Sequence, residues 1–152
     1  MKDILQFNEE NENSICFNFL EEKIREESRK LIERIYADEV QLFLDRMSSV
    51  VDENGNRLVV RNGYHRERIV QTACGNIEVR LPRVDDRNAT ERFVSKIIPP
   101  FARKTPTVET LIAALYLAGV SSNKFQEALS SIFGKDSKGF SPETIIRMTK
   151  DW

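Results

Sequence analysis

Apolar positions in the N-terminal third of the chain recur with the period of an α-helix. From Phe17 to Met47 they follow three-, four- and seven-residue steps with a single five-residue step: Leu20, Ile24, Leu31, Ile35, Val40, Phe43 and Met47. This spacing predicts one long helix, or two helices broken near Ala37-Asp38, within a helical region at residues 17–50. Two explanations of the apolar face stay open: a helix that packs on the rest of the chain, and a helix that mediates dimerisation.

The middle of the chain alternates apolar and polar residues with the period of a β-strand. Between residues 77 and 82 the apolar Ile77, Val79 and Leu81 alternate with Glu78, Arg80 and Pro82. We expect this strand to pair with a first strand at residues 66–72, across the short turn Ala73-Cys74-Gly75-Asn76. Pro82 should end the second strand or lie at a sheet edge. Residues 57–100 are therefore predicted to form a basic β-hairpin region, with a further short strand possible at residues 92–98. The irregular stretch 83–106 should be held against the rest of the fold.

The last third, residues 107–152, predicts three short helices. Thr107 is the expected cap of the first and Gly119 its end, and Ser121 or Ser122 is the expected cap of the second, which Gly134 closes. Ser141-Pro142-Glu143 combines a cap, a proline at the first helical position and an acid in the first turn, and so predicts the third. Three such helices in succession resemble a helix-turn-helix unit, although the connector 135–140 is longer than the tight turn of that motif.

Together these patterns predict an α+β fold: a long N-terminal helix, a small antiparallel hairpin or sheet, and a C-terminal trio of helices. Residues 1–16 are rich in Asn and Glu and show little periodicity, so we expect a flexible N-terminus.

Charge is strongly segregated along the 152 residues, although the net charge is only −1. Residues 1–55 hold 7 Lys and Arg against 14 Asp and Glu, a net charge of −7; residues 56–110 carry +5, and residues 111–152 carry +1. In the basic middle nine of the eleven cations are arginines, which bind phosphates with two hydrogen bonds at once. The asymmetry favours a polyanionic partner for the middle of the chain.

Composition and motifs argue against several other classes of function. Hydrophobic residues make up 40% of the chain, and no run approaches the roughly 18 apolar residues of a membrane span. The N-terminus is not that of a secretory signal, so we expect a cytoplasmic protein whose two separated cysteines are free thiols. His65 has no nucleophile at a recognised spacing, and Asp85-Asp86 lacks the third carboxylate of a two-metal site. We therefore predict no catalytic residue, no metal ligand and no cofactor in this chain.

Candidate DNA contacts fall in two groups. On the third C-terminal helix, the apolar Ile145, Met148 and Trp152 should take the buried side, which leaves four polar residues for the groove: Ser141, Thr144, Arg147 and Lys150. Arg147 can bind guanine with two hydrogen bonds. The hairpin region supplies five arginines to hold phosphates: Arg61, Arg66, Arg68, Arg80 and Arg83.

Three blocks of the sequence resemble the mutator-type family of bacterial insertion-sequence transposases. The first runs from Arg61-Asn62-Gly63-Tyr64 through Gly75-Asn76-Ile77-Glu78-Val79-Arg80-Leu81-Pro82-Arg83. The second is Leu115-Tyr116-Leu117-Ala118-Gly119-Val120-Ser121-Ser122 with Phe125-Gln126-Glu127-Ala128-Leu129 after it, and the third is Ser141-Pro142-Glu143-Thr144-Ile145-Ile146-Arg147. The three blocks occur in the family's order along residues 57–152, and this combination is specific to the family, whereas any one block alone is not.

The resemblance implies a protein that binds the terminal inverted repeats of its own element in the bacterial cytoplasm, on the nucleoid. Family members cut and join DNA with three carboxylates and a divalent metal such as Mg²⁺ on an RNase H-like domain, which begins shortly after the last block. None of the three carboxylates maps onto this chain, so the resemblance implies DNA binding but does not imply catalysis. The alternative function is a protein-interaction module that self-associates through residues 17–50, with incidental DNA affinity; a standalone enzyme is the least favoured class.

Overall fold

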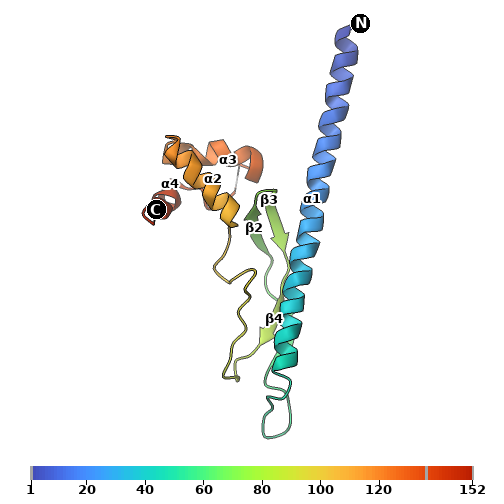
Figure 1. Ribbon diagram of the computed structural model, residues 1–152, viewed down its shortest axis with the longest axis vertical. Helices are drawn as coiled ribbons and strands as arrows, with labels where there is room; N and C mark the ends of the chain where they lie inside the picture. Colours follow the sequence, from blue (N-terminus) through green and yellow to red (C-terminus); the bar gives the residue numbers. More distant parts are fainter. Residues whose placement is uncertain (1, 136, 152) are drawn as a thin grey trace.

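The computed structural model describes the backbone of residues 2–135 and 137–151, and the side chains of residues 18–135 and 137–151. It confirms the α+β fold: a long N-terminal helix, four short strands and a C-terminal group of helices (Figure 1). The elements in order are α1 (Lys2–Arg46), β1 (Val60–Tyr64), β2 (Arg68–Thr72), β3 (Gly75–Val79), β4 (Pro82–Asp85), α2 (Pro106–Leu117), the 3₁₀ turn η1 (Ser122–Lys124), α3 (Phe125–Phe133) and α4 (Pro142–Thr149). Residues 2–16, expected to form a flexible N-terminus, belong to helix α1, and their side chains lie outside the described residues.

Helix α1 is continuous and does not break at Ala37-Asp38. Its buried face consists of Tyr36, Val40 and Phe43 and is continued by Met47 directly after the helix, at steps of four, three and four residues. The predicted apolar face is therefore buried within the chain only in its C-terminal half. Leu20, Ile24 and Leu31 are exposed, and Tyr36 takes the buried position that the pattern gave to Ile35. The five-residue step in the pattern marks the place where two different helix faces were joined.

The predicted hairpin is confirmed as the antiparallel pair β2–β3, with Thr72 opposite Gly75 across a turn formed by Ala73 and Cys74. Gly75 has a φ of 103°, which favours glycine. Ile77, Val79 and Leu81 are all buried, as the alternation predicts, and they share one core with Tyr36 and Val40 of α1. Helix α1 thus packs against the apolar side of the hairpin and completes the core between them.

A second antiparallel pair, β1–β4, was not predicted. Pro82 does not end a strand but begins β4, and the strand before it ends at Val79. All five residues of β1 are exposed, so no apolar alternation marks this strand in the sequence. The register shifts between Arg61 and Tyr64, where Gly63 has a φ of 64° and the strand bulges.

The stretch after β4 is irregular, and the strand considered at residues 92–98 does not form. It is held against α1, as expected for so long a connection. The Phe93 ring contacts the rings of Tyr36 and Phe43, with centroids 5.7 and 5.5 Å away. Glu39 of α1 accepts hydrogen bonds from the Ser95 hydroxyl and, at 3.0 Å, from the Lys96 amide. These ring contacts and the hydrogen bonds to Glu39 hold the segment on α1 without the hydrogen bonds of a third strand.

The C-terminal helices form a unit with a core of their own, drawn entirely from residues 108–145: Val108, Ile112, Phe125, Leu129, Phe133, Phe140 and Ile145. The ends at Gly119 and Gly134 and the cap at Ser141 are confirmed. The first cap was wrong: Thr105, and not Thr107, precedes the helix, with Pro106 at its first position.

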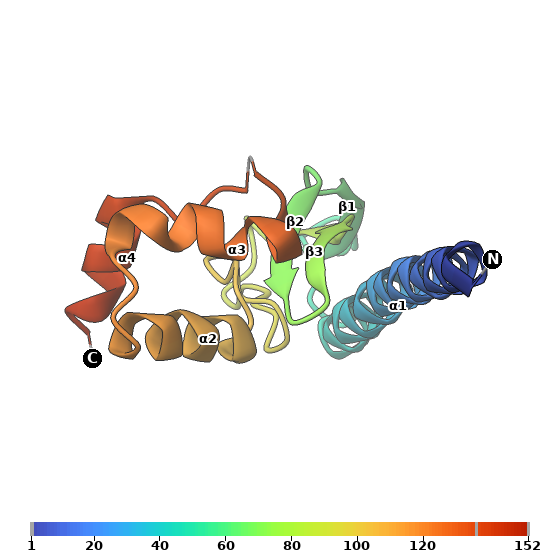
Figure 2. The same ribbon diagram turned by 90° about the horizontal axis from the view of Figure 1, so that it is seen from above.

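The β2–β3 hairpin lies between α1 and the helical unit (Figures 1 and 2). Polar contacts dominate the junction with the helical unit. The Asn76 amide donates to the Phe133 carbonyl at 3.0 Å and to the Ser137 hydroxyl at 2.9 Å. The Gln71 amide donates to the Lys138 carbonyl at 2.8 Å, and the Gln71 backbone bonds to Arg103 and Thr105. The helical unit is thus fixed to the edge of the sheet by two amide side chains and a short backbone bridge.

Candidate nucleic-acid interface

Three of the predicted phosphate contacts come together at the bulged end of β1–β4. The guanidinium carbons of Arg61 and Arg80 lie 4.9 and 4.3 Å from the centroid of the Tyr64 ring, which is half exposed. Arg83 donates from Nε to the Asn62 carbonyl at 3.1 Å. Cation–π contacts of this kind hold guanidinium groups in place while their N–H donors stay available. The sequence therefore builds a fixed group of exposed arginines around one aromatic ring.

The other two arginines of the predicted phosphate group have different surroundings. Arg68 is half-buried on β2, and its Nη2 donates to the carbonyls of Pro99, at 3.2 Å, and Ala102. Burial lowers the pKa of its guanidinium. Arg68 thus fastens the 99–102 segment to the hairpin, a role that the strand pattern did not reveal. Arg66 is exposed in the connection between β1 and β2 and is not part of the predicted strand.

The four predicted groove contacts lie on or beside α4. Ser141 is the N-cap, and its Oγ accepts a hydrogen bond from the Thr144 amide at 3.4 Å. Thr144 is half-buried, and its hydroxyl lies 3.0 Å from the Ser141 hydroxyl. Arg147 and Lys150 are exposed, whereas Ile145 is fully buried and Met148 half-buried. The predicted division of the helix into two sides is confirmed for Arg147, Lys150 and Ile145, whereas Thr144, expected on the exposed side, is half-buried; Trp152 lies outside the described residues.

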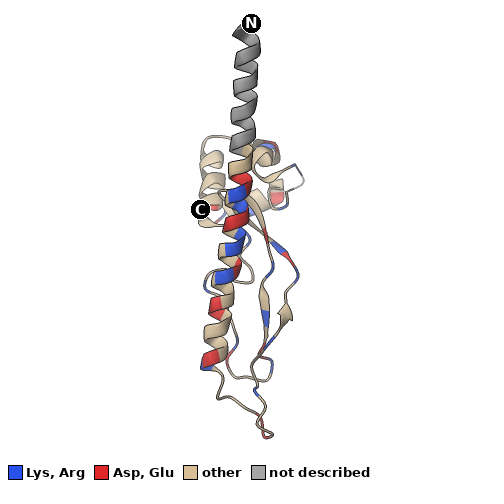
Figure 3. Cartoon of the chain, turned by 90° about the vertical axis from the view of Figure 1, so that its right-hand side faces the viewer, with Lys and Arg blue, Asp and Glu red and all other residues tan. Residues whose placement is uncertain are grey.

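Ion pairing separates two kinds of cation in the described part of the chain. On α1, Lys23 and Lys30 lie within 4 Å of Glu26 and Glu27, and bands of opposite charge alternate along the helix (Figure 3). Among the described residues, none of the seven cations in the predicted interface pairs with a carboxylate, and six of the seven are exposed. Helix α1 thus pairs several of its cations with its own carboxylates, while the described cations of the candidate interface have no carboxylate partner.

Lys104 is a further cation that the sequence did not single out. It lies half-buried between the hairpin and α4, with its Nζ 5.5 Å from the centroid of the Phe140 ring. Burial is the main cause that lowers the pKa of Lys104, and the nearby Arg103 and Arg147 lower it further. Its membership of the basic middle was visible in the sequence, but its place beside α4 depends on the backbone bridge from Gln71 to Lys104.

The residues present do not fit a divalent metal. Asp85 accepts hydrogen bonds from Arg87 at 2.9 Å through both oxygens, and Arg87 lowers the pKa of this carboxyl. Asp86 accepts from the Phe93 amide at 2.6 Å. Across the described residues, no three His, Cys, Asp or Glu side chains come close enough to hold an ion. The two acids are tied to different parts of the loop and do not converge.

The family model described as "Transposase, Mutator family" matches residues 2–152, so the chain belongs to the Mutator family of transposases. It is 28% identical over 90 residues to the transposase for insertion sequence element IS905 of Lactococcus lactis subsp. lactis (strain IL1403), which covers 59% of this chain and 21% of that protein. It is 26% identical over 129 residues to the transposase for insertion sequence element IS1201 of Lactobacillus helveticus, covering 84% of this chain and 32% of the relative.

The chain therefore spans between a fifth and a third of the length of these relatives. Within the described residues, no helix is both long and apolar enough to cross a membrane.

Proposed function

We propose that this chain is the portion of a Mutator-family transposase that binds the terminal inverted repeats of its insertion sequence, without cutting them. The observation that carries the proposal is the set of exposed cations with no carboxylate partner on α4 and around Tyr64. Cations in this state can replace the counterions of a DNA backbone without first breaking an ion pair. We place this activity in the bacterial cytoplasm, and we assign no metal ligand to the chain.

The two groups of contacts divide the work. Arg147 lies exposed near the end of a helix whose opposite side is buried, so it can enter a major groove and contact base edges. Arg61, Arg80 and Arg83 are held on strands and loops, where they can contact phosphates along the backbone. Arg68 contributes indirectly, since its donors already bind carbonyls of this chain.

The test is fluorescence anisotropy of the full chain on a duplex of its own inverted repeat and on a scrambled duplex, at several salt concentrations. We expect tighter binding to the repeat and a steep salt dependence, because each phosphate contact contributes about −0.9 to the slope of log K against log salt. Arg87→Ala is the matched control, since Arg87 belongs to the same basic middle but is paired with Asp85. Equal affinity for both duplexes with a flat salt dependence would contradict the proposal. Addition of Mg²⁺ should leave both duplexes uncut.

Self-association through α1 is the second candidate, and a specific feature favours it. The helix carries a second apolar face with an 11-residue repeat: Leu20, Leu31 and Leu42, with Ile24 and Ile35 between them. At 100° per residue this face lies roughly 140° around the helix from the buried face. The three leucines are 51%, 46% and 70% exposed, and Figure 3 looks directly onto this uncovered helix.

Charge complementarity points to a second, antiparallel copy of α1 as the partner. If the helices cross between residues 30 and 31, Glu27 of one copy lies opposite Arg34 of the other, and Lys23 lies opposite Asp38. The same alignment sets Leu20 beside Leu42, so apolar and charged pairings agree on one register. Two-fold pairing of this kind is the commonest form of oligomer.

Sedimentation equilibrium tests this association. We expect a dimer at about 50 µM, weakened by Glu27→Lys or Arg34→Glu and restored when both changes are combined. Leu31→Lys should give a monomer, whereas Leu117→Lys, at a still more exposed leucine of α2, should not. A wild-type monomer at that concentration, or failure of the double variant to recover, would rule out this pairing.

A further inference from the structure

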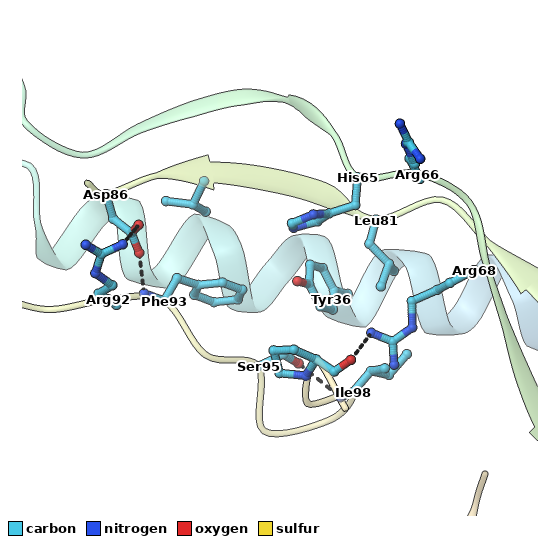
Figure 4. A pocket seen from close by; sticks show the side chains of 12 residues that line it. Tyr36, His65, Arg66, Arg68, Leu81, Asp86, Arg92, Phe93, Ser95 and Ile98 are labelled. Carbon is cyan, nitrogen blue, oxygen red and sulfur yellow. Dashed lines mark hydrogen bonds and ion pairs between the residues drawn. The ribbon is translucent and has the colours of Figure 1, made fainter. Parts of the chain in front are cut away.

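A cavity of about 570 Å³ opens beside α1, between the connection that joins β1 to β2 and the irregular segment after β4 (Figure 4). Its size is that of sites that hold small ligands. The apolar side chains that line it, among them Leu81, Phe93 and Ile98, belong to the core or pack against it. The cavity is therefore lined partly by core side chains, and its walls are fixed by the packing of these segments on α1.

Cations outnumber acids in the lining. Arg66, Arg68 and Arg92 contribute three positive charges, and Asp86 contributes the one carboxylate. That carboxylate is already occupied, because it accepts a hydrogen bond from the Phe93 amide at 2.6 Å and lies 3.9 Å from Arg92. Figure 4 shows Arg68 and Arg92 at opposite ends of the cavity. The space between them is consequently a region of positive potential.

Three hydrogen-bond donors around this space have no acceptor among the described residues: the Tyr36 hydroxyl, the His65 imidazole and the Arg66 guanidinium. In Figure 4 the His65 ring projects over the cavity near Tyr36, while Arg66 stands at the rim and points outward. Partial burial lowers the pKa of His65, and Arg83 and Arg68 lower it further. The surroundings of this ring thus disfavour a cation and favour an anion.

We propose that this cavity binds a phosphate group, which takes hydrogen bonds from Tyr36 and His65 and, after the exposed Arg66 side chain rotates toward it, from Arg66, in the positive potential between Arg68 and Arg92. Guanidinium groups match phosphate oxygens in geometry, and their attraction is strengthened where water is partly excluded. A DNA backbone and free inorganic phosphate offer the same group. The first source would deepen the DNA-binding function proposed above, and the second would be independent of it.

His65 is the single histidine of the chain, so its ring signal in a proton NMR spectrum reports on the cavity directly. We would titrate it from pH 5 to 8 in phosphate, in sulfate and in sodium chloride at equal ionic strength. Chloride is the essential control, because general screening of Arg68 and Arg83 also raises the pKa of His65. A bound dianion should raise the pKa of His65 by about one unit more than chloride does. Sulfate stays a dianion from pH 5 to 8 and should raise the pKa of His65 as phosphate does.

Variants locate the effect. Arg66→Ala and Tyr36→Phe each remove one donor, and each should weaken the saturable response to phosphate severalfold. Arg57→Ala removes an exposed arginine that does not line the cavity and should leave the response unchanged. A response to phosphate no larger than the response to chloride would overturn the proposal, as would an equal response in Arg66→Ala, Tyr36→Phe and the wild type.

The inverted-repeat duplex distinguishes the two sources. If the duplex moves the His65 signal and inorganic phosphate competes with it, a backbone phosphate occupies the cavity. If the duplex binds by anisotropy without moving the signal, while phosphate does move it, the cavity serves free phosphate. A phosphate response without any duplex binding would leave the cavity site intact and remove the DNA-binding function alone.

Discussion

The helical unit and the β region are held together by different kinds of contact. The core of the helical unit is drawn from residues 108–145, close together in the chain. The core of the β region joins Tyr36 and Val40 of α1 to strand residues and to Ile98, about sixty positions further on. Neither core shares a buried residue with the other, and polar groups link the two parts. Local contacts specify the first region, and long-range packing specifies the second.

Large-to-small changes in the two cores should have the largest effects and should separate the regions. Phe125→Ala, at a fully buried ring, should cost about 3–5 kcal/mol, and Leu81→Ala about 2–5 kcal/mol. Each variant should lose hydrogen-exchange protection mainly in its own region, because the two buried cores share no residue. Loss of protection throughout the chain in both variants would show a single cooperative unit instead.

This difference explains which parts of the fold could be predicted. In α4, the Ser141 cap, the proline after it and the buried Ile145 all lie within five residues, and the prediction is confirmed there. Pair β1–β4 was missed because β1 is exposed along its whole length, so no alternating pattern marks this strand as the partner of β4. On α1 the pattern merged two faces. Tyr36 in place of Ile35 would have given regular steps to Met47.

The candidate interface likewise contains residues that a local pattern places and residues that only long-range packing places. Arg147 could be placed on the exposed side of its helix because periodicity alone identifies that side. The stacking of Arg61 and Arg80 on Tyr64 depends on the unpredicted strand pair, and so does not follow from any local pattern. Arg68 was grouped with exposed arginines although it bonds to carbonyls 31 and 34 residues away. Its role as a DNA contact remains a prediction.

DNA binding should distinguish the two regions next. Arg147→Ala should cost about 1–3 kcal/mol on the inverted repeat and little on a scrambled duplex, because a base contact is lost. Arg61→Ala combined with Arg80→Ala should weaken both duplexes alike and reduce the salt slope by roughly two, since two phosphate contacts are lost. Competition titrations at two salt concentrations measure both quantities. If Arg147→Ala weakens both duplexes equally, the helix contacts the backbone and not the bases.

The junction between the regions should contribute less than either core. Asn76→Ala removes the amide that donates to the Phe133 carbonyl and the Ser137 hydroxyl, at an expected cost of about 1–2 kcal/mol. The side-chain oxygen of Asn76, Oδ1, is buried without a hydrogen-bond partner, so its removal should not lower the free energy of unfolding. Urea denaturation followed by circular dichroism measures the change, with the exposed Asn88→Ala as the control. An effect as large as that of Phe125→Ala would mean that the junction, and not its own core, holds the helical unit together.

The smallest expected effect concerns Ser141, which is both the cap of α4 and a predicted DNA contact. Its Oγ accepts from the Thr144 amide at 3.4 Å, a long hydrogen bond, so Ser141→Ala should cost about 0.5–1 kcal/mol, near the lower end for a cap. Asparagine caps helices as well as serine does, so Ser141→Asn should restore that stability. Hydrogen exchange of the α4 amides gives the stability, and anisotropy on the inverted repeat gives the affinity. If Ser141 acts only through the cap, the asparagine variant recovers both, and the alanine variant binds less than twofold more weakly. If the asparagine variant is stable but binds several times more weakly, the hydroxyl itself touches DNA, and the DNA-contacting surface of the helical unit includes the N-cap of α4.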